Sequence, residues 1–481
     1  MDVRRFCHMS LSGILLAVLL AGCDLRAPYV AQRPAPPTVP PPPTVGTPTV
    51  TSIPSPTLTP TLIPTPTTTP TPSATPIPLS PTPTLAPLAA SEREAIFTQV
   101  WELVRDRYIY RDYRGLDWDA VRREFALRVA AAASAEEFYD LLREMIDRLG
   151  DDHSRFESPQ DVAEERARFE GELNYAGIGA IVHLVPEGGL ITRLARGGPA
   201  EQAGLRPRDL ILAVGGIPLA DPDAFGPGGP ISAIRGAPGS QVRLTVRSPG
   251  QAPREVLVTR RTIPADAFPP VEASRLPGTQ VGLIVIDTFN SEAIDEQVRA
   301  RIEQLLQAGS LDGLVLDVRS NGGGRLDLML GTLALFIDGG SIGTSRGRDR
   351  ISNLTIPRGE TLPQLAGVPI VALIGPDTAS AAEMFAAGLQ AHQRARLVGM
   401  ATAGNTENLL PHDLPDGSRL WLAELAYYLP DGSLLEGQGV RPDREVPAEW
   451  WRFAPEHDPQ IGAALAELGV RLRRVPPEAV S

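Results

Sequence analysis

Apolar residues in the C-terminal half of the chain recur at two different spacings. Predominantly apolar runs, typical of buried strands, occur at residues 281–286, 311–318, 368–374 and 395–399. Segments with an apolar residue every three to four positions, typical of helices, occur at residues 292–307, 326–337 and 381–390. This alternation of strands and helices predicts an α/β fold with helices packed on a sheet, over residues 263–475.

Upstream, the pattern of residues 91–169 predicts only helices. Apolar residues follow the helical spacing at Ile96, Phe97, Val100, Trp101 and Val104. Ser91 and Glu94 have the spacing of a capping box at the start of this helix. Further helices are expected from residues 117 and 135, so this segment is predicted to be a small helical cap domain. It ends in a polar loop that contains His153.

The N-terminal part has a different composition. Residues 24–90 consist mainly of proline and threonine, which predicts an extended, disordered spacer. Before it, Arg4 and Arg5 precede a short apolar run, the pattern of a signal peptide over residues 1–23. The run ends in Leu-Ala-Gly-Cys23, which resembles the bacterial lipoprotein box and implies a lipid on Cys23. The alternative is an ordinary signal peptide with a chance cysteine. We therefore expect a domain anchored at the extracytoplasmic face of the cell membrane.

Charge and cysteine content narrow the possible partners. The formal net charge is −12, and no block of basic residues occurs, so nucleic acid is not expected as a partner. Both cysteines, Cys7 and Cys23, lie in the predicted signal peptide. The folded part therefore contains no disulfide and no cysteine-based metal site. No metal or other cofactor is implied by the sequence.

Ser380 lies where an apolar strand turns into a helix. The first N–H groups of a helix are unpaired and favour negative charge. A serine at this corner can attack a carbonyl group while the N–H of Ala381 stabilises the oxyanion. The alternative is that Ser380 only caps the helix.

Three glycines, Gly322, Gly323 and Gly324, lie in the loop just after the strand at residues 311–318. Glycine permits a close approach of the backbone, so the N–H of Gly323 is a candidate second oxyanion donor beside Ala381. The alternatives are a plain loop or a phosphate-binding loop. The latter lacks the Gly-Lys-Ser/Thr ending of a P-loop.

Residues 170–262 resemble the PDZ domains of bacterial proteases. The resemblance rests on the segment "GGPAEQAGLRPRDLILAVGG" at residues 197–216 and on "YAGIGA" at residues 175–180. It implies that Gly177, Ile178 and Gly179 bind the terminal carboxylate of a peptide that adds as a strand to the sheet edge. The alternative is a PDZ domain that serves only packing.

In chain order, the helical cap, the PDZ segment, "DVRSNGGG", "TASAAE" and "LEGQGVRPD" together resemble the tail-specific, or C-terminal processing, serine peptidases, including their tricorn-core branch. The resemblance covers residues 91–475. It implies a peptidase domain with the fold shared by Clp protease and crotonase, with the PDZ domain inserted after the cap. It also implies Ser380 as nucleophile and Gly323 and Ala381 as oxyanion donors.

The best-known branch of this family pairs the serine with a lysine about 25 residues later, but here that position is Asn405 (405 − 380 = 25) and no lysine occurs in this part of the chain. The tricorn-like branch implies instead His153 as base and Glu436 as the supporting carboxylate. His412 is the second candidate base, and Glu407 is the rival carboxylate.

The sequence thus predicts an exported, lipid-anchored serine endopeptidase that cleaves polypeptides near their C-termini with the help of its PDZ domain. The absence of the family's lysine supports the alternative of an inactive pseudo-peptidase that binds peptides or another ligand. The sequence predicts neither the identity of the substrate nor an oligomeric state.

Overall fold

The computed structural model describes residues 88–470, except 152, 170–174, 222–223, 226–228 and 265–266. The predicted signal peptide, the lipidation site Cys23 and nearly all of the predicted spacer lie outside the described residues. Among the described helices, none is both long enough and apolar enough to span a bilayer.

The predicted cap is helical. Its helices are α1 (Ala90–Arg107), α2 (Trp118–Ala131), α3 (Ala135–Asp147) and α4 (Pro159–Phe169). The apolar stripe predicted on α1 is buried in the cap core. The predicted capping box at Ser91 is wrong, because the helix begins before it. The N–H of Ala89 donates to the carboxylate of Glu92 (2.7 Å).

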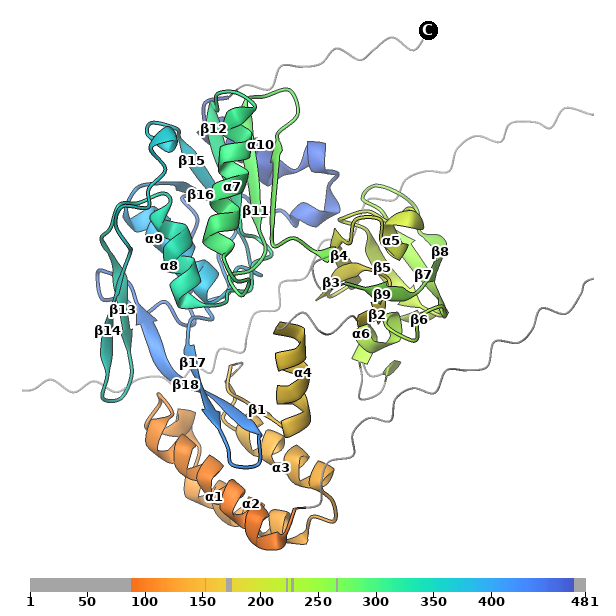
Figure 1. The fold of residues 1–481 in the computed structure, drawn as a ribbon, viewed down its shortest axis with the longest axis vertical. Coiled ribbons are helices and arrows are strands. Elements are labelled where there is room, and N and C mark those ends of the chain that lie inside the picture. Colours follow the sequence, from red (N-terminus) through yellow and green to blue (C-terminus); the bar gives the residue numbers. More distant parts are fainter. Residues whose placement is uncertain are drawn as a thin grey trace, which may run out of the picture. The chain divides into compact units, whose positions relative to one another are not determined.

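The cap shares its core with a hairpin from the far end of the chain, formed by β17 (Asn408–Asp413) and β18 (Arg419–Tyr428). Leu420 and Leu422 of β18 are buried among the cap's apolar side chains. The short strand β1 (Arg155–Glu157) pairs antiparallel with β18. Figure 1 shows this hairpin lying along the cap helices. The cap is therefore packed onto the peptidase region just where the loop of His153 begins β1.

The predicted PDZ segment forms a small β domain. Its elements are β2 (Tyr175–Gly177), β3 (Ala180–Val185), β4 (Gly188–Leu194), α5 (Pro199–Gln202), β5 (Leu210–Val214), β6 (Ile217–Pro218), α6 (Gly229–Ile234), β7 (Gln241–Arg247), β8 (Arg254–Thr259) and β9 (Arg261–Ile263). The main sheet has the order β3-β4-β5-β7-β8, so β3 is an edge strand. The predicted helix at "PAEQ" and strand at "LILAV" are confirmed as α5 and β5.

The α/β domain contains a six-stranded sheet of order β10-β11-β12-β15-β16-β19. Only β10 is antiparallel to its neighbour. The strands are β10 (Val271–Arg275), β11 (Val281–Ile286), β12 (Gly313–Asp317), β15 (Ile370–Ile374), β16 (Arg396–Gly399) and β19 (Arg444–Glu445). The helices are α7 (Ile294–Gln307), α8 (Leu326–Ala334), α9 (Ala381–Ala391) and α10 (Pro459–Glu467). The predicted α/β class and its strand and helix order are confirmed.

Both faces of this sheet are covered, which explains why its strands are predominantly apolar. Successive side chains of a strand point to opposite faces. Ile370, Ala372 and Ile374 of β15 pack in the core that contains α7, α8 and α9. The alternate residues Val371 and Leu373 pack with α10. When both faces of a strand are covered, neither set of side chains faces water. The strand therefore lacks an alternation of apolar and polar residues, as in other parallel sheets.

A second sheet was not predicted. It has the order β1-β18-β13-β14, with β17 also paired to β18. Strands β13 (Ser341–Arg346) and β14 (Ile351–Thr355) contain mostly polar side chains and glycine. β14 pairs with β13, and β13 pairs in turn with the long strand β18. This sheet connects the α/β domain to the cap.

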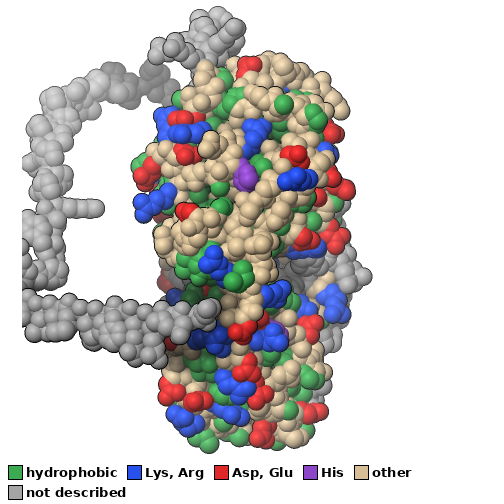
Figure 2. Space-filling model, turned by 90° about the vertical axis from the view of Figure 1, so that its left-hand side faces the viewer, with side chains coloured by type: hydrophobic (Ala, Val, Ile, Leu, Met, Phe, Trp, Pro, Cys, Tyr) green, Lys and Arg blue, Asp and Glu red, His purple; other side chains and the backbone are tan. Residues whose placement is uncertain are grey.

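All 45 basic side chains of the protein are arginines, since the sequence contains no lysine. Figure 2 shows basic and acidic side chains interspersed on the face it draws. A nucleic-acid backbone would meet carboxylates there as well as guanidinium groups, and that weakens binding. The exclusion of nucleic acid as a partner stays a prediction.

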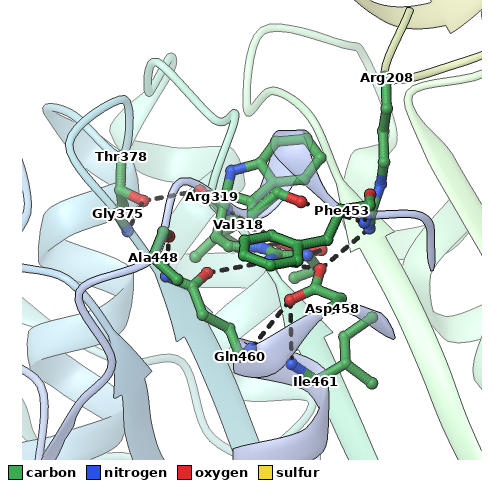
Figure 3. A network of polar contacts seen from close by, with 12 residues as sticks. Arg208, Val318, Arg319, Gly375, Thr378, Ala448, Phe453, Asp458, Gln460 and Ile461 are labelled. Carbon is green, nitrogen blue, oxygen red and sulfur yellow. Dashed lines mark hydrogen bonds and ion pairs between the residues drawn. The ribbon is translucent and has the colours of Figure 1, made fainter. Parts of the chain in front are cut away.

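One arginine is buried at the carboxyl end of β12 (Figure 3). Arg319 donates to both oxygens of Asp317 and to Asp458 Oδ2 (3.0 Å). Asp458 also caps α10, because its carboxylate accepts a hydrogen bond from the N–H of Gln460 (2.9 Å). It accepts a further hydrogen bond from Arg208 of the PDZ domain (3.0 Å). The network therefore ties the strand that carries the glycine loop to α10.

Replacing Arg319 by methionine is expected to lower the free energy of unfolding by about 3–5 kcal/mol, because the partly buried Asp317 loses its counter-charge and the buried Asp458 keeps only that of Arg208. Chemical denaturation followed by circular dichroism measures this change. The control Arg299→Ala breaks an exposed pair with Glu360 and is expected to cost about 1 kcal/mol or less. Equal costs for the two variants would contradict the role given to the buried network.

Candidate active site

Ser380 occupies the turn between β15 and α9 with an unusual backbone conformation. Its φ is 53° and its ψ is −124°, a region that residues other than glycine rarely adopt. Its hydroxyl makes no capping hydrogen bond within the described structure. Instead, the carboxylate of Glu383 accepts from the N–H of Ser380 (3.0 Å). Ser380 thus stands at the N-cap position while its hydroxyl stays available for chemistry.

The glycine loop reaches the same corner because β12 and β15 are neighbouring parallel strands. The loops that follow such strands leave the sheet at the same edge. The N–H of Ala379 donates to the carbonyl of Asn321 (3.0 Å), which joins the two loops. A Cβ on Gly323 would lie 2.7 Å from Ser380 Cβ, and φ at Gly323 is +103°. Glycine is therefore required at this position.

The two predicted oxyanion donors differ in their hydrogen bonds. The N–H of Ala381 has no acceptor among the residues that the structure describes. The N–H of Gly323 donates to Asn321 Oδ1 (2.8 Å), so it must exchange this bond before it can bind an oxyanion. Its role as a donor stays a prediction.

Asn405 stands where the best-known branch of the resembled family has its lysine, and its backbone positions Ser380. The carbonyl of Asn405 accepts from the N–H of Ser380 (2.7 Å). The N–H of Asn405 donates to Glu383 Oε2 (2.9 Å). Because the whole chain contains no lysine, no lysine of this chain can replace it as a base.

His153 lines the same cavity as Ser380, with a volume of about 830 Å³. Its loop is fixed by Asp151, which accepts from the N–H groups of His153 (3.0 Å) and Ser154. Ser154 Oγ in turn accepts from the N–H of Ala423 in β18 (3.1 Å). The contact between cap and hairpin therefore determines where the imidazole lies.

Both candidate carboxylates lie near His153. The Nε2 atom is 3.8 Å from Glu436 Oε1 and 3.9 Å from Glu407 Oε2. These are ion-pair distances and are too long for direct hydrogen bonds. Glu436 Oε2 accepts from the N–H of Thr406 (2.6 Å), and Glu407 Oε1 accepts from the hydroxyl of Tyr110. Both glutamates thus lie beside the same imidazole, at nearly equal distances from Nε2.

Burial and charge act in opposite directions on the pKa values of this cluster. Burial lowers the pKa of His153, but the carboxylates of Glu436 and Glu407 outweigh it, so the net pKa is raised. Burial raises the pKa of Glu407, and the nearby Glu436 adds to this. Burial also raises the pKa of Glu436, but hydrogen bonds and the charge of His153 bring it below its usual value. Glu436 therefore carries the negative charge more readily than Glu407.

The second candidate base, His412, lies in β17, and its Nε2 lies 2.5 Å from Glu424 Oε1. It is not among the residues that line the cavity of Ser380.

In the PDZ domain, Gly177 ends β2, and Ile178 and Gly179 connect it to the edge strand β3. A free edge beside this loop is what the addition of a peptide strand requires.

Sequence reasoning missed Tyr110, Thr406 and Asn321. Tyr110 lies in a loop of the cap, far from Glu407 in the sequence, and no local pattern points to that contact. Asn321 lies within the "DVRSNGGG" segment, and its side chain holds both Gly323 and the carbonyl of Ile286. Its position between a strand and three glycines was the one available signal.

Family models match three parts of the chain. Peptidase family S41 matches residues 280–446, the tricorn protease C1 domain matches residues 89–147, and a PDZ domain matches residues 190–248. These regions correspond to the α/β domain, the first helices of the cap and most of the PDZ sheet.

Curated relatives extend the match over most of the chain. A carboxyl-terminal-processing protease of Picosynechococcus sp. is 31% identical over 386 residues, covering 79% of this chain and 90% of the relative. A protease of the same name from Synechocystis sp. is 30% identical and covers 79% and 88%, respectively. Among solved structures, a photosystem II D1 C-terminal processing protease is similar in fold, with a TM-score of 0.56 and 24% identity over 79% of this chain and 99% of that one. The chain therefore belongs to peptidase family S41, within the carboxyl-terminal-processing serine peptidases.

Proposed function

We propose that the protein is an extracytoplasmic, lipid-anchored endopeptidase that cleaves polypeptides near their C-termini, with Ser380 as nucleophile and His153 as base. The observation that carries this proposal is that Ser380, with an uncapped hydroxyl, and His153 line one cavity in a chain without lysine. Cys23 is the proposed site of the anchor. Polypeptide C-termini are proposed as substrates from the names of the relatives.

In the proposed reaction, Ser380 Oγ attacks the carbonyl carbon of the scissile bond and gives its proton to the imidazole of His153. The N–H of Ala381 donates to the oxyanion. The imidazolium then protonates the leaving amine, and water hydrolyses the acyl enzyme. Glu436 stabilises the imidazolium that forms between these steps, because it lies closest to Nε2 and keeps its charge.

The PDZ domain is proposed to receive the substrate's C-terminal end. The N–H groups of the loop at Gly177, Ile178 and Gly179 would bind the carboxylate, and the peptide would add as a strand to β3. The free edge of β3 and the left-handed φ of Gly179 (+72°) support this assignment.

A second function, peptide binding without cleavage, is favoured by Asn405 at the position of the family's lysine. This function would use the same PDZ domain and the same cavity as the first one. The two functions differ only in whether the bound peptide is cleaved. An activity measurement separates the two.

Cleavage of an unfolded substrate protein by the full chain tests the nucleophile and the base. Ser380→Ala is expected to lower kcat/KM by at least about 10³-fold, and His153→Ala by roughly 10²–10⁴-fold. His412→Ala is the matched control and is expected to retain activity. If wild type and both site variants cleave at the same rate, the assignment of the site is wrong. If wild type does not cleave but binds the substrate, the second function is supported.

The pH dependence tests the electrostatics of His153. The neutral imidazole is the active form, and its pKa is raised above the ordinary value of 6.5. We therefore expect kcat/KM to fall as the pH decreases through a value above 6.5. Glu436→Gln removes a charge that stabilises the imidazolium. The acidic limb of the plot of kcat/KM against pH is therefore expected to move to lower pH by about one unit. Glu424→Gln is the control and leaves the limb in place. A limb that stays unchanged in Glu436→Gln would rule out the proposed pairing.

Two neighbouring glycines provide a matched pair of variants. A Cβ at Gly323 would collide with Ser380, whereas one at Gly322 would meet no atom within 4 Å. Gly323→Ala is expected to lower kcat/KM by about 10²-fold or more, because it displaces the nucleophile. Gly322→Ala is expected to cost much less. Equal activity of the two folded variants, with folding checked by circular dichroism, would show that the glycine loop does not position Ser380.

A further inference from the structure

The atoms His153 Nε2, Glu407 Oε2 and Glu436 Oε1 converge on one point. All three lie within 4.8 Å of one another. They come from three segments of the chain: the loop between α3 and β1, the loop before β17 and the loop after β18. One imidazole nitrogen and two carboxylate oxygens are the ligand types that zinc prefers, and three protein ligands leave a fourth position open.

Each carboxylate is held by one oxygen and presents the other. Glu436 Oε2 accepts from the N–H of Thr406 (2.6 Å) and from its hydroxyl (3.2 Å). Glu407 Oε1 accepts from the hydroxyl of Tyr110. Donors that orient the ligands in this way are a regular feature of metal sites.

Glu407 Oε2 gives an independent indication of a ligand. The side chain of Glu407 is fully buried, yet this oxygen has no hydrogen-bond partner in the described structure. A buried carboxylate oxygen without a partner is costly and calls for an unseen proton donor or ion. Its closeness to His153 Nε2 and Glu436 indicates that the missing partner belongs between these three groups.

We propose that His153, Glu407 and Glu436 bind a divalent cation, with zinc as the best match, and that the bound ion inhibits the peptidase. Zinc bonds of about 2.0–2.2 Å at tetrahedral angles place the ligand atoms roughly 3.4 Å apart. The two distances from His153 Nε2, 3.8 and 3.9 Å, must therefore shorten by about half an ångström. Two carboxylates and one neutral imidazole supply the negative charge that a dication requires.

Inhibition follows from the atom that the metal would occupy. A metal on Nε2 uses the lone pair of that nitrogen while Nδ1 carries the ring's proton, so the neutral imidazole has no lone pair left to accept the proton of Ser380. Metal binding and proton transfer therefore exclude each other at this imidazole. This half of the inference rests on the proposed function, whereas the binding of the metal does not.

Calorimetric titration of the chelator-treated full chain with Zn²⁺ tests the binding. We expect one ion per chain, and Co²⁺ in its place is expected to give the visible absorption of a four-coordinate site. Glu407→Gln, which keeps the shape of the side chain, is expected to weaken the affinity at least about tenfold, and His153→Gln more strongly. Glu424→Gln, which alters the His412 pair outside the cavity, is the matched control and leaves the affinity unchanged.

Ser380→Ala separates this inference from the proposed function, because it is expected to bind Zn²⁺ like wild type while lacking activity. The site is refuted if wild type binds no Zn²⁺, or if Glu407→Gln and His153→Gln, folded by circular dichroism, bind it as tightly as wild type. If Zn²⁺ binds and the peptidase keeps its full rate at saturation, the inhibitory role is refuted. Inhibition that follows the calorimetric binding curve supports both halves.

Discussion

The buried carboxylate of Glu383 accepts four hydrogen bonds: from the N–H groups of Ser380, Gly404 and Asn405 and from the hydroxyl of Thr402. A buried carboxylate without such donors would be strongly unfavourable. These bonds join the start of α9 to the loop after β16, and they hold Ser380 in a backbone conformation that costs about 1–3 kcal/mol elsewhere. The position of the nucleophile in the site depends on this one group, which the "TASAAE" segment supplies three residues after the serine.

The rest of the site depends on packing between distant segments. The cap buries part of the hairpin β17–β18, and the strand β1 adds to its edge. His153 stands just before β1, Glu407 just before β17, and Glu436 after β18. One contact between cap and hairpin therefore brings the imidazole and both carboxylates together. In this arrangement the peptidase domain supplies the serine and the two carboxylates, while the cap supplies the imidazole.

The sequence was most informative where function and local structure share one segment. Ser380 could be predicted because an apolar strand, a serine and a helix follow one another, and Gly323 because three glycines end a strand. His153 could be found only through resemblance, since a single loop histidine has no local signature. The contact of Tyr110 with Glu407 and the sharing of one imidazole by two glutamates could not be predicted, because they join residues that are far apart in the sequence. The second sheet was missed for the same reason: β13 pairs with β18, which lies far from it in the sequence, and β14 pairs with β13.

We propose that Ser380 is a nucleophile and that His153 activates it. Labelling of the full chain with a fluorophosphonate, which reacts only with activated serines, tests this claim without any knowledge of the substrate. Mass spectrometry of the digested protein is expected to find the phosphonyl group on Ser380 in wild type, and far slower labelling in folded His153→Ala. Labelling of Ser380 at equal rates in both proteins would show that His153 does not activate the serine, and no labelling of wild type would show that Ser380 is not an activated nucleophile.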